Sequence, residues 1–176
     1  MEKLLFLLSC NLLLFISPVM GSMGNSSNTA PPIGEVKVVN FDELEPLLCP
    51  NPEDNEVYIV NFFATWCKPC VEELPHFLEL HRKYKDEGLH FVLVSLDFLR
   101  QLDSRLIPFI GEHQVEAEVF LLNDPYANEW IPKVSGDWTG AIPATLVCNG
   151  DKSEFFEKTF HSIGELEDII KPFLKD

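Results

Sequence analysis

Hydrophobic residues fall along this chain in two kinds of pattern, and each kind predicts a different element. Residues 57–63 and 89–96 are almost wholly apolar, rich in β-branched and aromatic side chains, and show little alternation, which is typical of strands covered on both faces. Between them, from Lys68 to Asp86, apolar residues recur at helical spacing, and Pro75 is expected to kink the helix or remove one of its hydrogen bonds. Two buried strands joined by a helix form a βαβ unit, whose strands pair in parallel.

Shorter patterns predict the remaining elements. Asn149-Gly150 is the strongest short hairpin signal in the chain, so the strands on either side of it are expected to be antiparallel. Ser162, with Glu165 three residues later, is expected to cap a final amphipathic helix. The predicted strands are 35–41, 118–122, 144–148 and 153–160, and the predicted helices are 42–48, 99–113, 128–134 and 163–174.

The order of these elements predicts an α/β fold. A mixed central sheet is flanked by helices on both faces, because strands and helices alternate along most of the chain before a hairpin and a last helix close it. The helical segment at 128–134 is an insertion before the loop that carries Pro143.

The first 22 residues are predicted to be a secretory signal peptide and not part of the fold. Lys3 precedes an almost unbroken apolar run, residues 4–16, and small residues follow around Gly21-Ser22, where a signal peptidase would cut. The run is short for a membrane span, although an uncleaved membrane anchor is the alternative. Residues 23–33 are rich in Ser, Asn, Gly and Pro and are expected to form a flexible leader. Residues 34–176 then form one domain of ordinary size.

Composition narrows the functions open to such a domain. The chain has 176 residues, 46% of them hydrophobic, and a net charge of −15. The apolar content is enough for a proper core. Because binding to nucleic acid needs clustered Lys and Arg, the charge argues against nucleic acid as a partner. The five cysteines are too sparse for a disulfide-stapled miniprotein.

Two of the cysteines lie where a buried strand is expected to end and a helix to begin, in the segment Trp66-Cys67-Lys68-Pro69-Cys70. A cysteine at a helix N-terminus faces unpaired N–H groups and the positive end of the helix dipole, and both favour the thiolate. The thiolate is the species that attacks a disulfide. Two intervening residues bring the second sulfur within reach of the first, and Pro69 suits the first turn of a helix. We therefore expect Cys67 to be an exposed nucleophile and Cys70 a buried resolving cysteine.

Two other interpretations of this pair compete with redox chemistry. Cysteines at this spacing can be half of a zinc site, and His76 and His81 follow in the same predicted helix. A Cys2His2 finger, however, leaves about twelve residues between its cysteine and histidine pairs, far more than separate Cys70 from His76. A static structural disulfide is the other alternative, although so short a bridge is unusual as a staple. We expect no metal, and no cofactor besides the cysteine pair itself.

The segment from Asn61 to Pro75 resembles the active-site segment of the thioredoxin superfamily. More narrowly, it is similar to the TlpA/ResA-like branch, which includes the cytochrome c maturation reductases. That branch has the pattern W-C-x-P-C followed by x-x-E-x-P, and Glu73 and Pro75 complete the match. The resemblance covers about residues 34–176, and it implies a thioredoxin fold and thiol–disulfide oxidoreductase activity.

A second segment, residues 140–145, resembles the cis-proline loop of the same family. The resemblance implies a cis bond between Ile142 and Pro143 and a platform there for the backbone of a substrate chain. An ordinary trans proline at the start of a strand is the alternative. Trp66 is expected to shield the active site while also packing against the fold.

The resemblance also bears on proton transfer. Thioredoxins proper carry a buried Asp at the position of Asn61, so that role cannot belong to Asn61 here. The TlpA/ResA-like branch instead places an acid at Glu73, one helical turn after Cys70. A partly buried carboxylate there would have a raised pKa and would accept the proton of Cys70. A solvated helix glutamate like Glu72 is the alternative, and the sequence does not decide between them.

Cys49 and Cys148 have no partner pattern in the sequence. Cys148 lies in a predicted strand, where a small buried hydrophobe is the default interpretation. Cys49 stands in a loop, where a free thiol is one interpretation. A bridge between the two is a further alternative, because sequence does not show proximity.

These features together predict an exported thiol–disulfide oxidoreductase in a bacterial periplasm or on the outer face of the membrane. Reduction of protein disulfides is preferred over oxidation, because Ile142 before the proline resembles reducing thioredoxins. The expected partners are protein thiol or disulfide substrates, apocytochrome c among them, and a membrane electron donor. The alternatives are an oxidising dithiol enzyme and a metal-handling binding protein of thioredoxin fold, although the copper-handling branch separates its cysteines by three residues.

Overall fold

The computed structural model describes residues 35–50, 56–150 and 152–174. The predicted signal peptide, residues 1–22, and the predicted leader, residues 23–33, lie outside the described residues. Among the helices that are described, none combines the length and the apolar character needed to cross a membrane.

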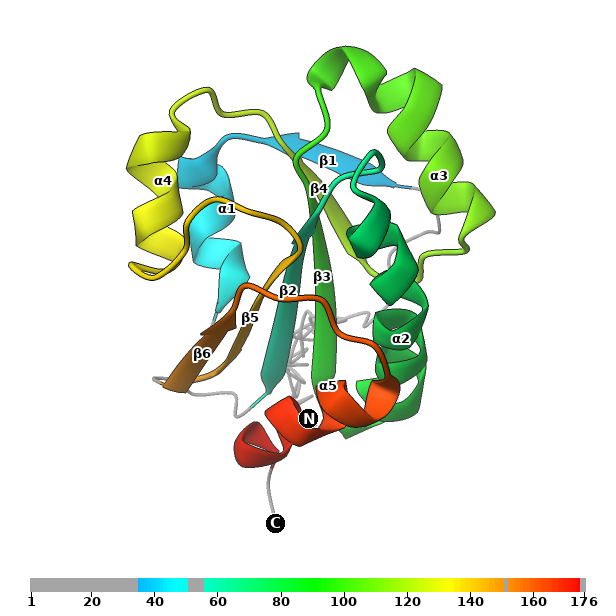
Figure 1. The fold of residues 1–176 in the computed structure, drawn as a ribbon, viewed down its shortest axis with the longest axis vertical. Coiled ribbons are helices and arrows are strands. Elements are labelled where there is room, and N and C mark those ends of the chain that lie inside the picture. Colours follow the sequence, from blue (N-terminus) through cyan, green and yellow to red (C-terminus); the bar gives the residue numbers. More distant parts are fainter. Residues whose placement is uncertain (1–34, 51–55, 151, 175–176) are drawn as a thin grey trace, which may run out of the picture.

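Six strands form one mixed sheet in the order β1-β4-β3-β2-β5-β6 (Figure 1). The first four of these pair in parallel, whereas β5 is antiparallel to β2 and β6 is antiparallel to β5. The predicted α/β fold, with its βαβ unit and closing hairpin, is therefore confirmed. The strands are β1 (Val36–Val39), β2 (Val57–Phe63), β3 (Leu89–Ser95), β4 (Glu118–Leu122), β5 (Ala144–Asn149) and β6 (Lys152–Phe156).

Helices cover both faces of the sheet. On one face lie α2 (Lys68–Tyr84) and α5 (Ile163–Ile170), and on the other lie α1 (Phe41–Leu48) and the inserted α4 (Ala127–Val134) (Figure 1). Successive side chains of a strand point to opposite faces, so the neighbours Phe62 and Phe63 of β2 enter different cores. Because both faces are buried, β2 is apolar almost throughout and shows no alternation.

Two segments differ from the predicted elements. The stretch predicted as helical at 99–113, with a break at Pro108 as an open alternative, consists of a 3-10 turn (Leu99–Gln101), a π-helical turn (Leu102–Leu106) and α3 (Ile107–Glu112). Strand β6 ends at Phe156 and not at residue 160, because the N–H of Phe160 donates to the Glu73 carboxylate on α2 and not to a neighbouring strand.

Local signals at the chain's turns are confirmed. Strands β5 and β6 meet at the pair Asn149–Lys152, and Gly150 has the positive φ of 59° that a tight hairpin turn requires. The Oγ of Ser162 accepts the Glu165 N–H at 3.3 Å and so caps α5.

Cys49 and Cys148 form a disulfide, with their Cα atoms 6.2 Å apart. The interpretations of Cys49 as a free thiol and Cys148 as an unpaired hydrophobe are therefore wrong, and the bridge is the alternative that the fold realises. Cys49 ends α1 and Cys148 lies in β5, so the bond ties α1 to the sheet across 99 residues of sequence.

Candidate active site

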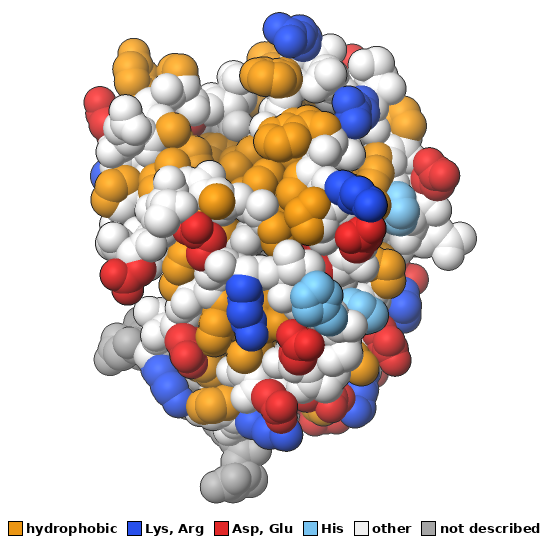
Figure 2. Space-filling model, in the orientation of Figure 1, with side chains coloured by type: hydrophobic (Ala, Val, Ile, Leu, Met, Phe, Trp, Pro, Cys, Tyr) orange, Lys and Arg blue, Asp and Glu red, His pale blue; other side chains and the backbone are white. Residues whose placement is uncertain are grey.

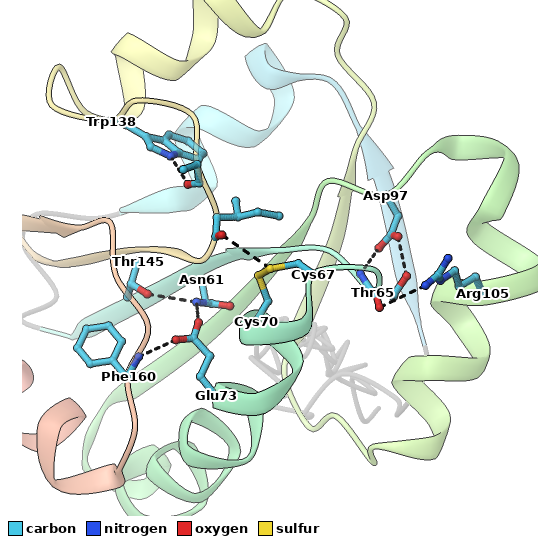
Figure 3. Close-up of a disulfide and its surroundings, with 12 residues drawn as sticks. Asn61, Thr65, Cys67, Cys70, Glu73, Asp97, Arg105, Trp138, Thr145 and Phe160 are labelled. Carbon is cyan, nitrogen blue, oxygen red and sulfur yellow. Dashed lines mark hydrogen bonds between the residues drawn. A yellow bond between two sulfur atoms is a disulfide. The ribbon is translucent and has the colours of Figure 1, made fainter.

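The second disulfide joins Cys67 and Cys70 at the start of α2, with Cα atoms 5.3 Å apart (Figure 3). The chain leaves β2 at Phe63 and turns once, closed by a hydrogen bond from the Cys67 N–H to the Ala64 carbonyl at 3.0 Å. Cys67 is then the N-cap of α2, and its carbonyl accepts the Val71 N–H at 3.1 Å. The pair therefore stands at the positive end of the helix dipole, where a thiolate is favoured.

The sulfurs are less accessible than the sequence suggested. Cys67 is 6% exposed and Cys70 1%, so the expectation of an exposed Cys67 is wrong, although Cys67 remains the more accessible of the two. The reason is the loop opposite, because the Cys67 Sγ lies 3.8 Å from the carbonyl oxygen of Ile142. Trp66 is 51% exposed, so much of its side chain faces solvent.

The peptide bond between Ile142 and Pro143 is cis, as predicted. The loop before it is held by Trp138, whose indole N–H donates to the Ala141 carbonyl at 2.8 Å (Figure 3). The Trp138 ring packs in turn against Phe62 of β2, with ring centroids 4.7 Å apart. The sheet thus fixes the loop against Cys67 through Trp138, a residue that no sequence pattern singled out.

Glu73 is fully buried beneath the disulfide, so the alternative of a solvated glutamate is wrong. It lies three residues after Cys70, and both residues occupy the buried face of α2. Its carboxylate accepts hydrogen bonds of 2.9 Å each from the Asn61 amide and the Phe160 N–H (Figure 3). Burial raises the pKa of the Glu73 carboxyl from its ordinary 4.5 to about 7, although the hydrogen bonds from Phe160 and Asn61 act in the opposite direction.

Asn61 extends this buried network to the neighbouring strand. Its amide also donates to the Thr145 hydroxyl at 3.2 Å, and the two residues are direct partners across β2 and β5. Thr145 follows Pro143 by two residues, so one chain of hydrogen bonds links the strand after the cis-proline to the carboxyl below Cys70.

An apolar groove opens beside the site, with a volume of about 640 Å³. It lies between α4 and the segment that follows β3, and Figure 2 shows hydrophobic side chains gathered in this hollow. Phe98 and Leu99, 57% and 47% exposed, stand on one wall. Asp97 and Gly140 also line it, and Asp97 accepts a hydrogen bond from Thr65 in the turn before Cys67, so one residue of the groove wall contacts that turn.

Among residues 35–50, 56–150 and 152–174, no three His, Cys, Asp or Glu side chains gather closely enough to hold a metal ion.

The structure also brings in a residue that the sequence did not single out. Asp97 follows β3 at the carboxyl end of the parallel strands, where functional side chains of α/β folds collect, and that position was the available signal.

The sheet order, the cysteine pair at a helix start and the cis-proline loop together define a protein of thioredoxin fold. A thiol:disulfide interchange protein of the thioredoxin family from Chlorobium tepidum TLS superposes with a TM-score of 0.54 and 25% identity, over 69% of this chain and 81% of that one. The sequence profile of the AhpC/TSA family matches residues 51–151. The chain therefore belongs to the AhpC/TSA family.

Relatives of known name agree with this class. The thiol-disulfide oxidoreductase ResA of Bacillus thuringiensis is 29% identical over 93 residues, and the ResA of Bacillus cereus is 45% identical over 93 residues. Each match covers 52% of this chain and 48% of the relative. The chain thus spans about half the length of these relatives.

Proposed function

We propose that this protein is an exported thiol–disulfide oxidoreductase that reduces protein disulfides through Cys67 and Cys70. One observation carries the proposal: a cysteine pair joined at the N-terminus of α2 lies against a cis-proline loop and above a buried carboxyl. A static staple would need neither the loop nor the carboxyl. The names of the ResA relatives support the same chemistry.

The reaction starts from the reduced pair. The Cys67 thiolate attacks one sulfur of a substrate disulfide, which forms a mixed disulfide and releases the other substrate sulfur as a thiolate that takes up a proton. Cys70 then attacks the Cys67 Sγ, which releases the second substrate thiol and closes the Cys67–Cys70 bond. Two electrons have passed from the cysteine pair to the substrate. A dithiol donor must return them, and we assign this task to a membrane electron donor.

Glu73 supports the second step. Cys70 is almost fully buried, so its thiol needs a nearby base before it can attack. With a pKa of about 7, the Glu73 carboxyl is able both to take this proton and to release it near neutral pH. Asn61 and the Phe160 N–H keep the carboxylate oriented on the buried face of α2.

Two features support a protein substrate and an exported enzyme. The apolar groove beside Cys67 offers a place for side chains that flank a substrate cysteine, and we assign it to a segment of the substrate polypeptide. The Cys49–Cys148 bond is of a kind that persists in oxidising compartments, which agrees with the predicted signal peptide and a periplasmic or outer-face location. From the resemblance to cytochrome c maturation reductases we extend the proposal to apocytochrome c as a substrate.

Insulin reduction with a dithiol donor tests the activity. Wild type should reduce insulin, and Cys67→Ser should be inactive; equal inactivity of both proteins with every donor would refute the proposal. The reduction potential of the Cys67–Cys70 pair tests the direction. A value near that of thioredoxin, about −270 mV, supports a reductase, whereas a value near about −120 mV would identify the oxidising dithiol enzyme instead.

A further inference from the structure

Asp97 is a buried acid that the mechanism above leaves unused. It is 4% exposed and lies two residues after the end of β3 (Figure 3). Its carboxylate accepts three hydrogen bonds: from the Thr65 N–H at 2.9 Å, from the Thr65 hydroxyl at 2.6 Å and from the Ser95 hydroxyl at 2.8 Å. Burying a carboxylate is costly unless donors surround it, and here three do.

Thr65, the residue that Asp97 binds, lies in the turn that leads from β2 to Cys67. Thr65 and Trp66 are the central residues of the turn that the bond between Cys67 and Ala64 closes. The Thr65 carbonyl accepts a further hydrogen bond from Arg105 at 3.5 Å (Figure 3). Every polar group of Thr65 is therefore bonded to a segment outside the turn.

We propose that Asp97 is a positioning residue, which acts through Thr65 to hold Cys67 in place for Cys70 and so sets the reduction potential of the pair. Cys67 ends the turn at residues 64–67, and Cys70 lies in the first turn of α2. A disulfide between two such near residues forms readily when the chain already holds the sulfurs together, because the effective concentration of one thiol at the other is then high. Hydrogen bonds to a carboxylate are stronger than hydrogen bonds between neutral groups. The contacts between Asp97 and Thr65 therefore restrict the turn at residues 64–67 more than a neutral side chain at position 97 would. The importance of that potential for substrates rests on the proposed function.

The test is an equilibrium with glutathione, in which two glutathione thiols reduce the Cys67–Cys70 bond and form glutathione disulfide. Mass spectrometry of the trapped peptides distinguishes this pair from the other cysteines. Asp97→Ala should shift the equilibrium towards the reduced pair by about tenfold, equal to about 30 mV for a two-electron couple. Thr65→Val, which loses the hydroxyl but keeps the N–H, should shift it in the same direction by less. The double variant of Asp97→Ala and Thr65→Val should shift the equilibrium little further than Asp97→Ala alone, because both substitutions act on the same contact.

Two variants separate positioning from other causes. Ser95→Ala is the matched control, because it removes one donor from the same carboxylate and the acceptor of the Asp97 N–H without touching Thr65; it should leave the equilibrium close to wild type. Asp97→Asn keeps an acceptor for the Thr65 N–H but removes the charge, so it should restore part of the wild-type equilibrium. Melting temperatures of all variants are recorded alongside.

Two results would overturn the proposal that Asp97 positions Cys67. A purely structural role would lower the melting temperature of Asp97→Ala without moving the equilibrium, and that result would overturn the proposal. A shift in Asp97→Asn as large as in Asp97→Ala would overturn it too, since charge and not hydrogen bonding would then be the cause. The titration needs no enzyme activity. An inactive wild type in the insulin assay would therefore refute the proposed function and leave this inference standing if the equilibrium still shifts.

Discussion

Replacing Glu73 by Gln removes one ionisable group from the core and changes almost nothing else. The glutamine can accept the Phe160 N–H with its oxygen. Its amide can donate to the oxygen of Asn61 once the Asn61 amide has rotated, and the Thr145 hydroxyl can donate to that same oxygen. The rotated Asn61 NH2 group loses the two acceptors that it has in wild type, but this cost is the same at every pH because neither amide titrates. Any strong pH dependence that disappears in Glu73→Gln therefore comes from the carboxyl itself.

The sign and size of the effect follow from the pKa of Glu73. Burial raises it from 4.5 in an unfolded chain to about 7 in the folded protein. Between these values the unfolded chain has lost a proton that the folded protein still holds, so the free energy of unfolding falls as the pH rises through this window. It is highest below pH 4.5 and levels off above about 7. At 1.36 kcal/mol per pH unit, the total loss is about 3 kcal/mol.

Urea unfolding of the oxidised protein at about pH 5 and about pH 8.5 measures this loss. From the lower to the higher pH, the free energy of unfolding of Glu73→Gln should rise relative to that of wild type by most of about 3 kcal/mol, because the glutamine does not titrate. Glu72→Gln is the matched control. It removes the same charge from the same turn of α2, but the Glu72 side chain is 62% exposed and pairs with Lys68 only at the surface. Its stability should follow wild type at both pH values.

A difference between Glu73→Gln and wild type that is the same at both pH values would refute the reasoning. The carboxyl would then have an ordinary pKa in the folded protein, and its assignment as the proton acceptor of Cys70 would lose its physical basis. A pH-dependent gain that Glu72→Gln shares would also refute it, since the cause would then be the overall negative charge of the chain.

Three further predictions concern the cysteines and the groove. Cys70→Ser should accumulate a mixed disulfide with substrate at Cys67, detected by mass spectrometry; accumulation at Cys70 in Cys67→Ser instead would reverse the two roles. Replacing Cys49 and Cys148 together by Ala should lower the free energy of unfolding by about 2–4 kcal/mol and leave the exchange rate with a small disulfide unchanged. A lost exchange rate in a folded double variant would show that this bond takes part in the chemistry. Phe98→Ser should raise KM for insulin without slowing that small-disulfide exchange, and an unchanged KM would remove the groove from substrate binding.

The central strands could be predicted closely because burial on both faces leaves a continuous signal. Strands β2 and β4 have the predicted bounds, and β3 ends one residue early. The end of β6 could not be predicted, since it depends on a hydrogen bond between Phe160 and Glu73, which lie far apart in sequence. The segment at 99–113 has helical composition throughout, and composition does not distinguish a π-helical turn from an α-helix.

For the site, sequence located the cysteine pair of the proposed reaction but not its environment. Cys67 and Cys70 are recognisable because they lie three residues apart at the point where a predicted strand ends and a predicted helix begins. Glu72 and Glu73 are chemically identical neighbours, and only the register of α2 against the sheet decides which one is buried. Asp97 acts on Thr65 from a different strand end, and that contact exists only once β2 and β3 have paired.

The two disulfides differ in how much chain their opening would release, and this difference agrees with the proposed roles of the four cysteines. A disulfide stabilises a fold in proportion to the freedom that it removes from the unfolded chain, so the gain grows with the length of the loop it closes. Cys67 and Cys70 are three residues apart, and breaking their bond releases little chain. Cys49 and Cys148 are 99 residues apart, and their bond restrains more than half of the protein. The pair that we propose to react is therefore the one whose opening releases less chain.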